Sequence, residues 1–185
     1  MKTLAPIKAD DFARIAAVLG PCELVEGEIV PLAPAGMEHS EVTMRILLAL
    51  VAWNRQAKKG RVLTNEIGLV VKEDPDTVRG ADVLFISYKR LPAAEKWKGF
   101  LRHKPELVVE ILSADVSWKK MEEKVAEYHA FGVDLVWVAD PQTQSVRLYP
   151  KGKASRVLHG QDELAGGHLL PGFRCKVVEF FVDKS

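Results

Sequence analysis

The sequence has little cysteine, little net charge and no long apolar run. Its only cysteines among 185 residues are Cys22 and Cys175. Their separation fits no zinc-binding or redox spacing, so we expect free thiols in a reducing cytosol, with a disulfide as the lesser alternative. The net charge of +1 excludes a protein that coats polyanions with its whole surface, so nucleic-acid contact would need a local basic patch. No apolar run reaches the length of a membrane span and no signal-like core follows the first residues, which predicts a cytoplasmic chain without membrane contact.

Repeats, low-complexity tracts and linkers are also absent, which together with the length predicts one domain over residues 1–185. Apolar patterns predict helices and strands in alternation. The expected helices are 8–19, 37–58 and 117–131, and the expected strands are 22–25, 28–32, 61–64, 67–71, 81–86, 107–112, 134–140, 146–149 and 156–158. Helices that alternate with apolar, β-branched strands favour an α/β fold with a mixed central β-sheet flanked by helices.

Two of the expected strands each carry a single acid. Glu110 interrupts the apolar run from Leu107 to Leu112, and Asp82 lies near the start of the run 81–86. A carboxylate in a strand that is buried on both faces costs several kcal/mol unless it is neutralised, paired or solvated. The sequence therefore predicts that Asp82 and Glu110 lie on one face of the sheet and share a divalent metal ion.

The helix expected over 117–131 directs a lysine toward the same region. Its apolar stripe includes Met121 and Tyr128, and Lys124 lies three residues after the first and four before the second. Lys124 would therefore flank the buried stripe, with its ammonium near Glu110. An ammonium that extends past the core into water fits the same pattern.

These residues and several short motifs resemble those of a known family. The motifs are Glu23-Leu-Val-Glu-Gly-Glu28-Ile-Val, Pro34-Ala-Gly-Met-Glu38-His39, Asp82, Val-Val-Glu110-Ile-Leu-Ser, Glu122-Glu-Lys124, Tyr128-His-Ala-Phe-Gly132-Val, Val136-Trp-Val-Ala-Asp140-Pro141 and Leu170-Pro-Gly-Phe173. In this order and spacing they resemble the Uma family of restriction endonucleases, within the PD-(D/E)XK nuclease superfamily. The resemblance covers residues 20–182.

The resemblance implies a restriction-endonuclease-like fold and a Mg²⁺-dependent (or Mn²⁺-dependent) endonuclease that hydrolyses DNA. Asp82 and Glu110 would be the metal ligands, together with the backbone carbonyl of Ile111. The usual lysine of the superfamily lies two residues after the glutamate, where this chain has Leu112. The resemblance implies that Lys124 takes its place, so that Asp82, Glu110 and Lys124 form the catalytic set.

Further residues are candidates for supporting roles. Glu38 and His39 would supply an auxiliary ligand or a proton-transfer group, and for His39 local bonding at a helix N-terminus is an equal alternative. Arg79 would either bind a phosphate or pair with an acid, and the pairing is slightly favoured. Structural roles are favoured for Glu28 and Glu66.

The connection 87–104 is rich in lysine and arginine. Lys96, Lys98 and Arg102 are candidates for contacts with the DNA backbone, because basic residues interleaved with aromatic ones suit single nucleic-acid strands. A plain solvated loop would have the same composition. Long connections inside a compact domain are usually functional or mobile.

A homodimer is expected from the resemblance to dimer-forming nucleases and from large apolar residues that look exposed, namely Trp97, Phe100, Phe180 and Phe181. Two alternatives to an active nuclease stay open. One is a catalytically silent nuclease-fold module that binds nucleic acid or a protein partner, and the other is a structural subunit of a larger complex.

Three substitutions would test the lysine. Lys124→Met is expected to keep the fold, because methionine fits a half-buried helix position, and to lose cleavage. Lys119→Met and Lys120→Met, expected on the outer face of the helix, should change cleavage little.

Overall fold

The computed structural model describes residues 5–96 and 98–181, in which helices alternate with strands as expected. In chain order the elements are α1 (Ala9–Leu19), β1 (Cys22–Val25), β2 (Glu28–Pro31), α2 (Met37–Ala57), β3 (Gly60–Lys72), β4 (Thr77–Ser87), β5 (Leu107–Ile111), α3 (Trp118–Phe131), β6 (Leu135–Asp140), β7 (Ser145–Pro150), β8 (Arg156–His159), β9 (Glu163–Ala165), β10 (Arg174–Lys176) and the 3-10 helix η1 (Val177–Phe180).

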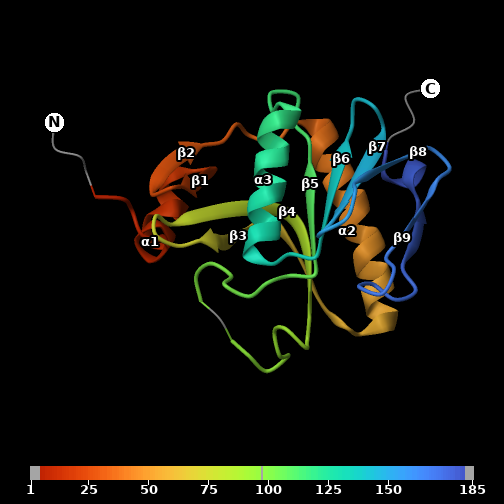
Figure 1. The fold of residues 1–185 in the computed structure, drawn as a ribbon, viewed down its shortest axis with the longest axis horizontal. Helices are drawn as coiled ribbons and strands as arrows, with labels where there is room; N and C mark the ends of the chain where they lie inside the picture. Colours follow the sequence, from red (N-terminus) through yellow and green to blue (C-terminus); the bar gives the residue numbers. More distant parts are fainter. Residues whose placement is uncertain (1–4, 97, 182–185) are drawn as a thin grey trace.

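An eight-stranded mixed sheet forms the centre of the fold. Its strands run in the order β2-β1-β4-β5-β6-β7-β8, and β3 pairs with β4. Figure 1 shows α3 in front of the sheet and α2 behind it. The predicted α/β fold, with a mixed central sheet flanked by helices, is confirmed.

The two faces of the sheet are filled by alternate residues of the same strands. On β5, Val109 packs in one apolar cluster with Val42 of α2, whereas Val108 packs in another with Val125 of α3. Successive side chains of a strand point to opposite faces, so an apolar, β-branched run such as β5 can bury both. All five residues of β5 are buried.

Helix α3 is the crossover between two parallel strands. Strands β5 and β6 pair in parallel, with Leu107 opposite Leu135, and parallel neighbours require a long connection, usually a helix. Ser117 caps α3 by accepting a hydrogen bond from the Lys120 amide. The C-terminal end of β5 and the N-terminal end of α3 therefore meet at the same edge of the sheet.

Strand β3 is longer than expected. The two predicted strands over 61–64 and 67–71 are one strand, whose register with β4 shifts between Thr64 and Ile67. Asn65 and Glu66, between these two residues, have φ values of 73° and 49°, which is the left-handed conformation usual in turns. In the sequence, this polar pair is typical of a turn between two strands. A polar dipeptide in a bulge explains why the prediction divided the strand.

The apolar residues expected on the surface are mostly covered. Phe180 is 1% and Phe181 is 6% exposed, because η1 and the residue after it pack into the α2-side cluster. Phe100 is half-buried, with its ring 5.4 Å from that of Phe12. Trp97 lies outside the described residues. The expectation that the three phenylalanines form exposed apolar surface for a homodimer is therefore wrong.

Within residues 5–96 and 98–181, none of the helices combines the length and the apolar composition needed to cross a membrane.

Candidate active site

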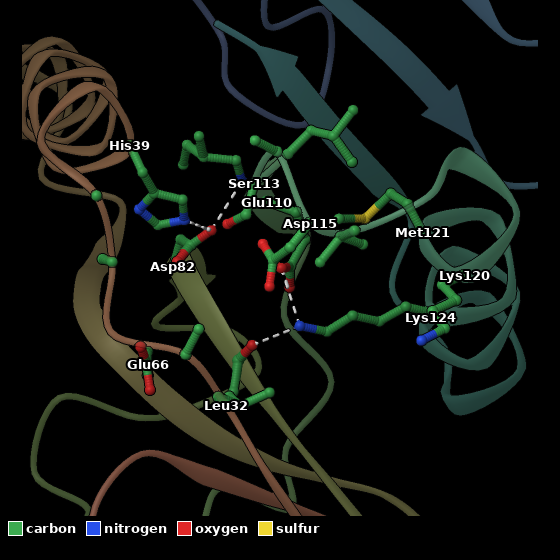
Figure 2. A pocket seen from close by; sticks show the side chains of 18 of the residues that line it. Leu32, His39, Glu66, Asp82, Glu110, Ser113, Asp115, Lys120, Met121 and Lys124 are labelled. Carbon is green, nitrogen blue, oxygen red and sulfur yellow. Dashed lines mark hydrogen bonds and ion pairs between the residues drawn. The ribbon is translucent and has the colours of Figure 1, made fainter.

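A cavity of about 840 Å³ opens at the edge of the sheet where β5 ends and where α2 and α3 begin. The loop before α2 and the loop after β5 form much of its wall (Figure 2). Its acidic lining residues are Glu23, Glu38, Glu66, Asp82, Glu110, Asp115 and Glu123, and its basic ones are Arg79, Lys120 and Lys124, with His39. The predicted catalytic residues thus line one cavity.

Asp82 and Glu110 lie side by side where two strands separate. The antiparallel pairing of β4 with β5 ends at Val83 opposite Val109, so the next two residues would be Asp82 and Glu110. Here the ladder is replaced by a side chain, because Oδ2 of Asp82 accepts a hydrogen bond of 2.7 Å from the Ile111 amide. The acid of one strand thereby holds the end of the other.

Asp82 is turned toward α2 by a slip in strand alternation. Ala81 and Leu84 both contact the α3-side cluster, whereas Val83 belongs to the α2-side cluster. The register shift in β3 lies opposite this point, and bulges of this kind re-aim side chains beside functional sites. Oδ2 of Asp82 consequently lies 3.4 Å from Nε2 of His39.

Lys124 points into the sheet and not into water. Its side chain is 17% exposed, and its ammonium donates hydrogen bonds of 2.9 Å to Oε2 of Glu110 and to the carbonyl of Gly80. Oε1 of Glu23 lies 3.1 Å from the same ammonium. The partners of Asp82 and Glu110 therefore come from helices on opposite faces of the sheet, which differs from the expectation that both acids lie on one face. Both acids nevertheless line the same cavity at the edge of the sheet (Figure 2).

Burial and charge set the protonation of this cluster. Burial raises the pKa of Glu110 to about 7, and the Asp82 carboxylate adds to the rise while Lys124 opposes it. Burial alone would lower the pKa of Lys124, but the Glu110 and Glu23 carboxylates outweigh it and raise that pKa. Lys124 therefore stays protonated, and Glu110 takes up a proton at higher pH than an exposed glutamate does.

Two residues of the cluster were missed in the sequence. Tyr128 donates a hydrogen bond of 2.6 Å to Oε1 of Glu110, and its position four residues after Lys124, on the same helix face, could have suggested this. Glu23 is a buried acid within the apolar strand β1, the same anomaly as Glu110. Burial works to raise the pKa of Glu23, but Lys124 and Arg79 outweigh it and lower that pKa.

Comparison with known families identifies the family of this chain. A model of the Uma2 family, described as "Putative restriction endonuclease", matches residues 9–178. The chain belongs to the Uma2 family. The family supports a nuclease-like function, and the resemblance to it noted in the sequence is confirmed.

A solved structure shows the same fold. The chain is similar to a protein from Anabaena variabilis described as "a putative nuclease belonging to DUF820", with a TM-score of 0.77 and 20% identity, over 95% of this chain and 97% of the other. A search among curated proteins finds no match. The Uma2-family fold, with helices on both faces of a mixed sheet, is thus shared by a known structure.

In this Uma2-family chain Arg79 pairs with acids. Its guanidinium donates to Oε2 of Glu23 at 2.8 Å and to both carboxylate oxygens of Glu127 at 2.6 and 2.9 Å. A guanidinium held by two carboxylates has most of its donors engaged. The geometry therefore corresponds to the pairing alternative, and a phosphate contact of Arg79 remains a prediction.

The other basic candidates do not line the cavity. In Figure 1 the connection that carries Lys96, Lys98 and Arg102 lies below the sheet, at the opposite end from the start of α3. Arg102 forms ion pairs with Asp10 and Glu73. Lys120, expected on the outer face of α3, does line the cavity. Within the described residues, the three side chains of the connection therefore lie outside the cavity lining, and their contact with DNA remains a prediction.

Glu38 and His39 both line the cavity from the first turn of α2. Burial would lower the pKa of His39, but its hydrogen bond to Asp82 and the nearby acids outweigh burial and raise that pKa. His39 therefore contacts a predicted metal ligand, and Glu38 lies beside it in sequence. Their auxiliary roles remain predictions.

The donor set fits a hard divalent cation. Mg²⁺ is usually held by one or two carboxylates, with water and phosphate completing its shell, and Asp82 and Glu110 supply such carboxylates. Oδ1 of Asp82 has no hydrogen-bond partner among the described residues. No group of three or more His, Cys, Asp or Glu side chains in residues 5–96 and 98–181 is placed to hold a metal, so a fully protein-ligated zinc site does not fit.

Proposed function

We propose that the chain is a Mg²⁺-dependent (or Mn²⁺-dependent) endonuclease that hydrolyses DNA phosphodiester bonds in this cavity. One observation carries the proposal: the Lys124 ammonium lies 2.9 Å from Oε2 of Glu110, in a cavity that Asp82 also lines. Phosphodiester hydrolysis needs ligands for a cation and a fixed positive charge beside the reacting phosphate. Membership of the Uma2 family supports a nuclease-like activity.

Each residue has a distinct task in this proposal. Asp82, Glu110 and the Ile111 carbonyl would hold the cation, which when bound acts as a Lewis acid and lowers the pKa of a water molecule. Lys124, kept protonated by its carboxylate partners, would orient the attacking water and offset negative charge on the phosphoryl oxygens. Tyr128 fixes the position of the Glu110 carboxylate by its hydrogen bond.

The charge of the cavity explains why a cation would be required. Seven acidic side chains and three basic ones line it, besides His39. A DNA phosphate that entered this lining alone would meet repulsion, strongest near the buried acids where the effective dielectric constant is low. A divalent ion on Asp82 and Glu110 would offset part of that repulsion as well as activate water.

Cleavage assays with several DNA forms test the proposal. Supercoiled plasmid, linear duplex and single-stranded DNA are incubated with the chain, with and without Mg²⁺ or Mn²⁺. We expect metal-dependent cleavage that falls by about 100-fold or more in Asp82→Asn and Glu110→Gln. Glu122→Gln, at an exposed position on α3, is the matched control and should cleave normally.

The same assay separates an active enzyme from a catalytically silent module. A silent module predicts DNA binding, weakened by salt, without cleavage of any form at either metal. That result with folded protein would refute the proposed hydrolysis. Cleavage that survives both acid substitutions would place the active site elsewhere.

A further inference from the structure

The outer face of α2 carries a stripe of exposed apolar side chains. Met37 is 78% exposed, Met44 52% and Leu48 58%. The inner face of the same helix is filled by the buried Val42 and Ile46, so the stripe is not needed to hold α2 on the sheet. Several large apolar residues on one side of one helix are typical of a surface that another protein covers.

One charged residue lies on the same line seven residues before Leu48, and another lies seven residues after it. Glu41, Leu48 and Arg55 are each separated by seven residues, close to two helical turns, so they follow one another along the stripe. The acid lies toward the N-terminal end and the base toward the C-terminal end, each about 10 Å from Leu48 along the axis. Met37 precedes Glu41 and lines the cavity, so the part of the stripe from Glu41 to Arg55 has an apolar centre and ends of opposite charge.

A second α2 that runs antiparallel would match this stripe. If the pair is centred on Leu48, Leu48 meets its own equivalent, Met44 meets Ala52, and Glu41 meets Arg55. Two-fold symmetry produces each off-axis contact twice. A parallel pair in register would instead place Glu41 against Glu41 and Arg55 against Arg55, which is unfavourable.

We propose that the outer face of α2 is the interface between two copies of the chain, packed as antiparallel helices across a two-fold axis at Leu48. The stripe complements itself, which favours a second copy over an unrelated partner. Helix α2 has 21 residues and is about 30 Å long, which allows side chains to interdigitate over several turns. This interface differs from the phenylalanines and Trp97 considered in the sequence.

The arrangement fixes the spacing of the two cavities. His39 lines the cavity from the first turn of α2 and lies nine residues before Leu48, about 13 Å along the axis. The two cavities would thus lie at opposite ends of the helix pair, about 27 Å apart along it. This spacing holds whatever reaction the cavity performs.

Light scattering after gel filtration tests the interface. The chain should elute with twice its own mass at micromolar concentration. Leu48→Glu brings two carboxylates together on the axis and should halve that mass, with helix content unchanged by circular dichroism. Val18→Glu, at an apolar α1 position that is 84% exposed, is the control and should stay dimeric. A monomeric wild-type chain at about 100 µM overturns the proposal by mass action, and so does a Leu48→Glu chain that remains dimeric.

Charge exchange tests the antiparallel pairing. Glu41→Arg places two positive charges together and should weaken the dimer, as should Arg55→Glu with two negative charges. The double variant restores opposite charges and should recover the dimer. A double variant no better than either single one would overturn the pairing of Glu41 with Arg55.

Cross-linking through introduced cysteines gives a third test. In a chain with Cys22 and Cys175 replaced by alanine, Leu48→Cys should form an intermolecular disulfide, because the two sulfur atoms meet at the axis. Glu41→Cys alone should not cross-link, whereas chains carrying Glu41→Cys mixed with chains carrying Arg55→Cys should. Efficient cross-linking by Glu41→Cys alone would indicate a parallel pair and overturn the proposal.

Discussion

Replacing Lys124 with methionine would remove the positive charge that two buried carboxylates share. The ammonium lies 2.9 Å from Glu110 and 3.1 Å from Glu23, whose side chains are 4% and 5% exposed. Removal of one partner from a buried ion pair costs about 3–5 kcal/mol, because the other charge stays buried without compensation. At about 2–4 °C per kcal/mol for a chain of this length, the melting temperature should fall by roughly 6–20 °C. This replaces the sequence-based expectation that Lys124→Met leaves the fold unharmed.

The loss should depend on pH. Without Lys124, burial raises the pKa of Glu110 in the folded chain further above its value in the unfolded chain, whereas Glu23 keeps its ion pair with Arg79. An acid of this kind binds more protons when folded, so the free energy of unfolding falls as pH rises through the interval between the two values. The melting temperatures of Lys124→Met and wild type should therefore converge at about pH 5 and diverge at about pH 8.

Differential scanning calorimetry at the two pH values, in metal-free buffer, measures the effect. Lys119→Met is the matched control, because Lys119 is exposed on the same helix. It should melt within about 2 °C of wild type at both pH values, since exposed substitutions usually change stability by at most about 0.5 kcal/mol. Equal melting temperatures for Lys124→Met and Lys119→Met at high pH would refute the buried charge pair.

Four further outcomes follow from the site. Because the pKa of Glu110 is about 7, Mn²⁺ affinity measured by calorimetry should fall about tenfold per pH unit below that pH and level off above it. The pKa of His39 is raised in the folded chain, so protonated His39 stabilises the fold below the unfolded pKa of about 6.5, and this contribution is lost as pH rises through the folded pKa. His39→Gln should therefore lower the melting temperature at acidic but not at alkaline pH. Tyr128→Phe removes a donor to a buried carboxylate and should cost about 1–3 kcal/mol in urea denaturation. Lys96→Ala combined with Lys98→Ala should leave any cleavage rate within about twofold, since residues outside the cavity lining alter affinity more than chemistry, and a larger fall in rate at saturating DNA would contradict that placement.

The sequence predicted the parts of the fold that follow from local periodicity. Continuous apolar runs identified β4 and β5, and the single acid in each run marked the residues that line the cavity. The helical spacing of Lys124 from Met121 and Tyr128 indicated the orientation that the structure has. These features depend on the residues of one element and on the burial of its faces, which composition and period reveal.

The remaining features depend on contacts between distant segments. The slip of β4 at Asp82 is coupled to the bulge at Asn65 and Glu66 in the neighbouring strand, which no local pattern in β4 encodes. Phe180 and Phe181 looked exposed because the site that covers them is formed by other segments. The connection 87–104 lies at the end of the sheet toward which β4 runs. The direction of β4 determines this position, and the composition of the connection does not reveal it.

The position of Lys124 also bears on how such sites change over evolutionary time. A charge needed at one point in space can be delivered either from a strand, at the position of Leu112, or from the helix that follows it. Under the proposed role of Lys124, a chain with lysine at both positions could supply the charge from either element. Under that proposal, searches that require a glutamate and a lysine at fixed linear spacing would miss a site of this kind, whereas searches by the placement of charged atoms around Glu110 would find it.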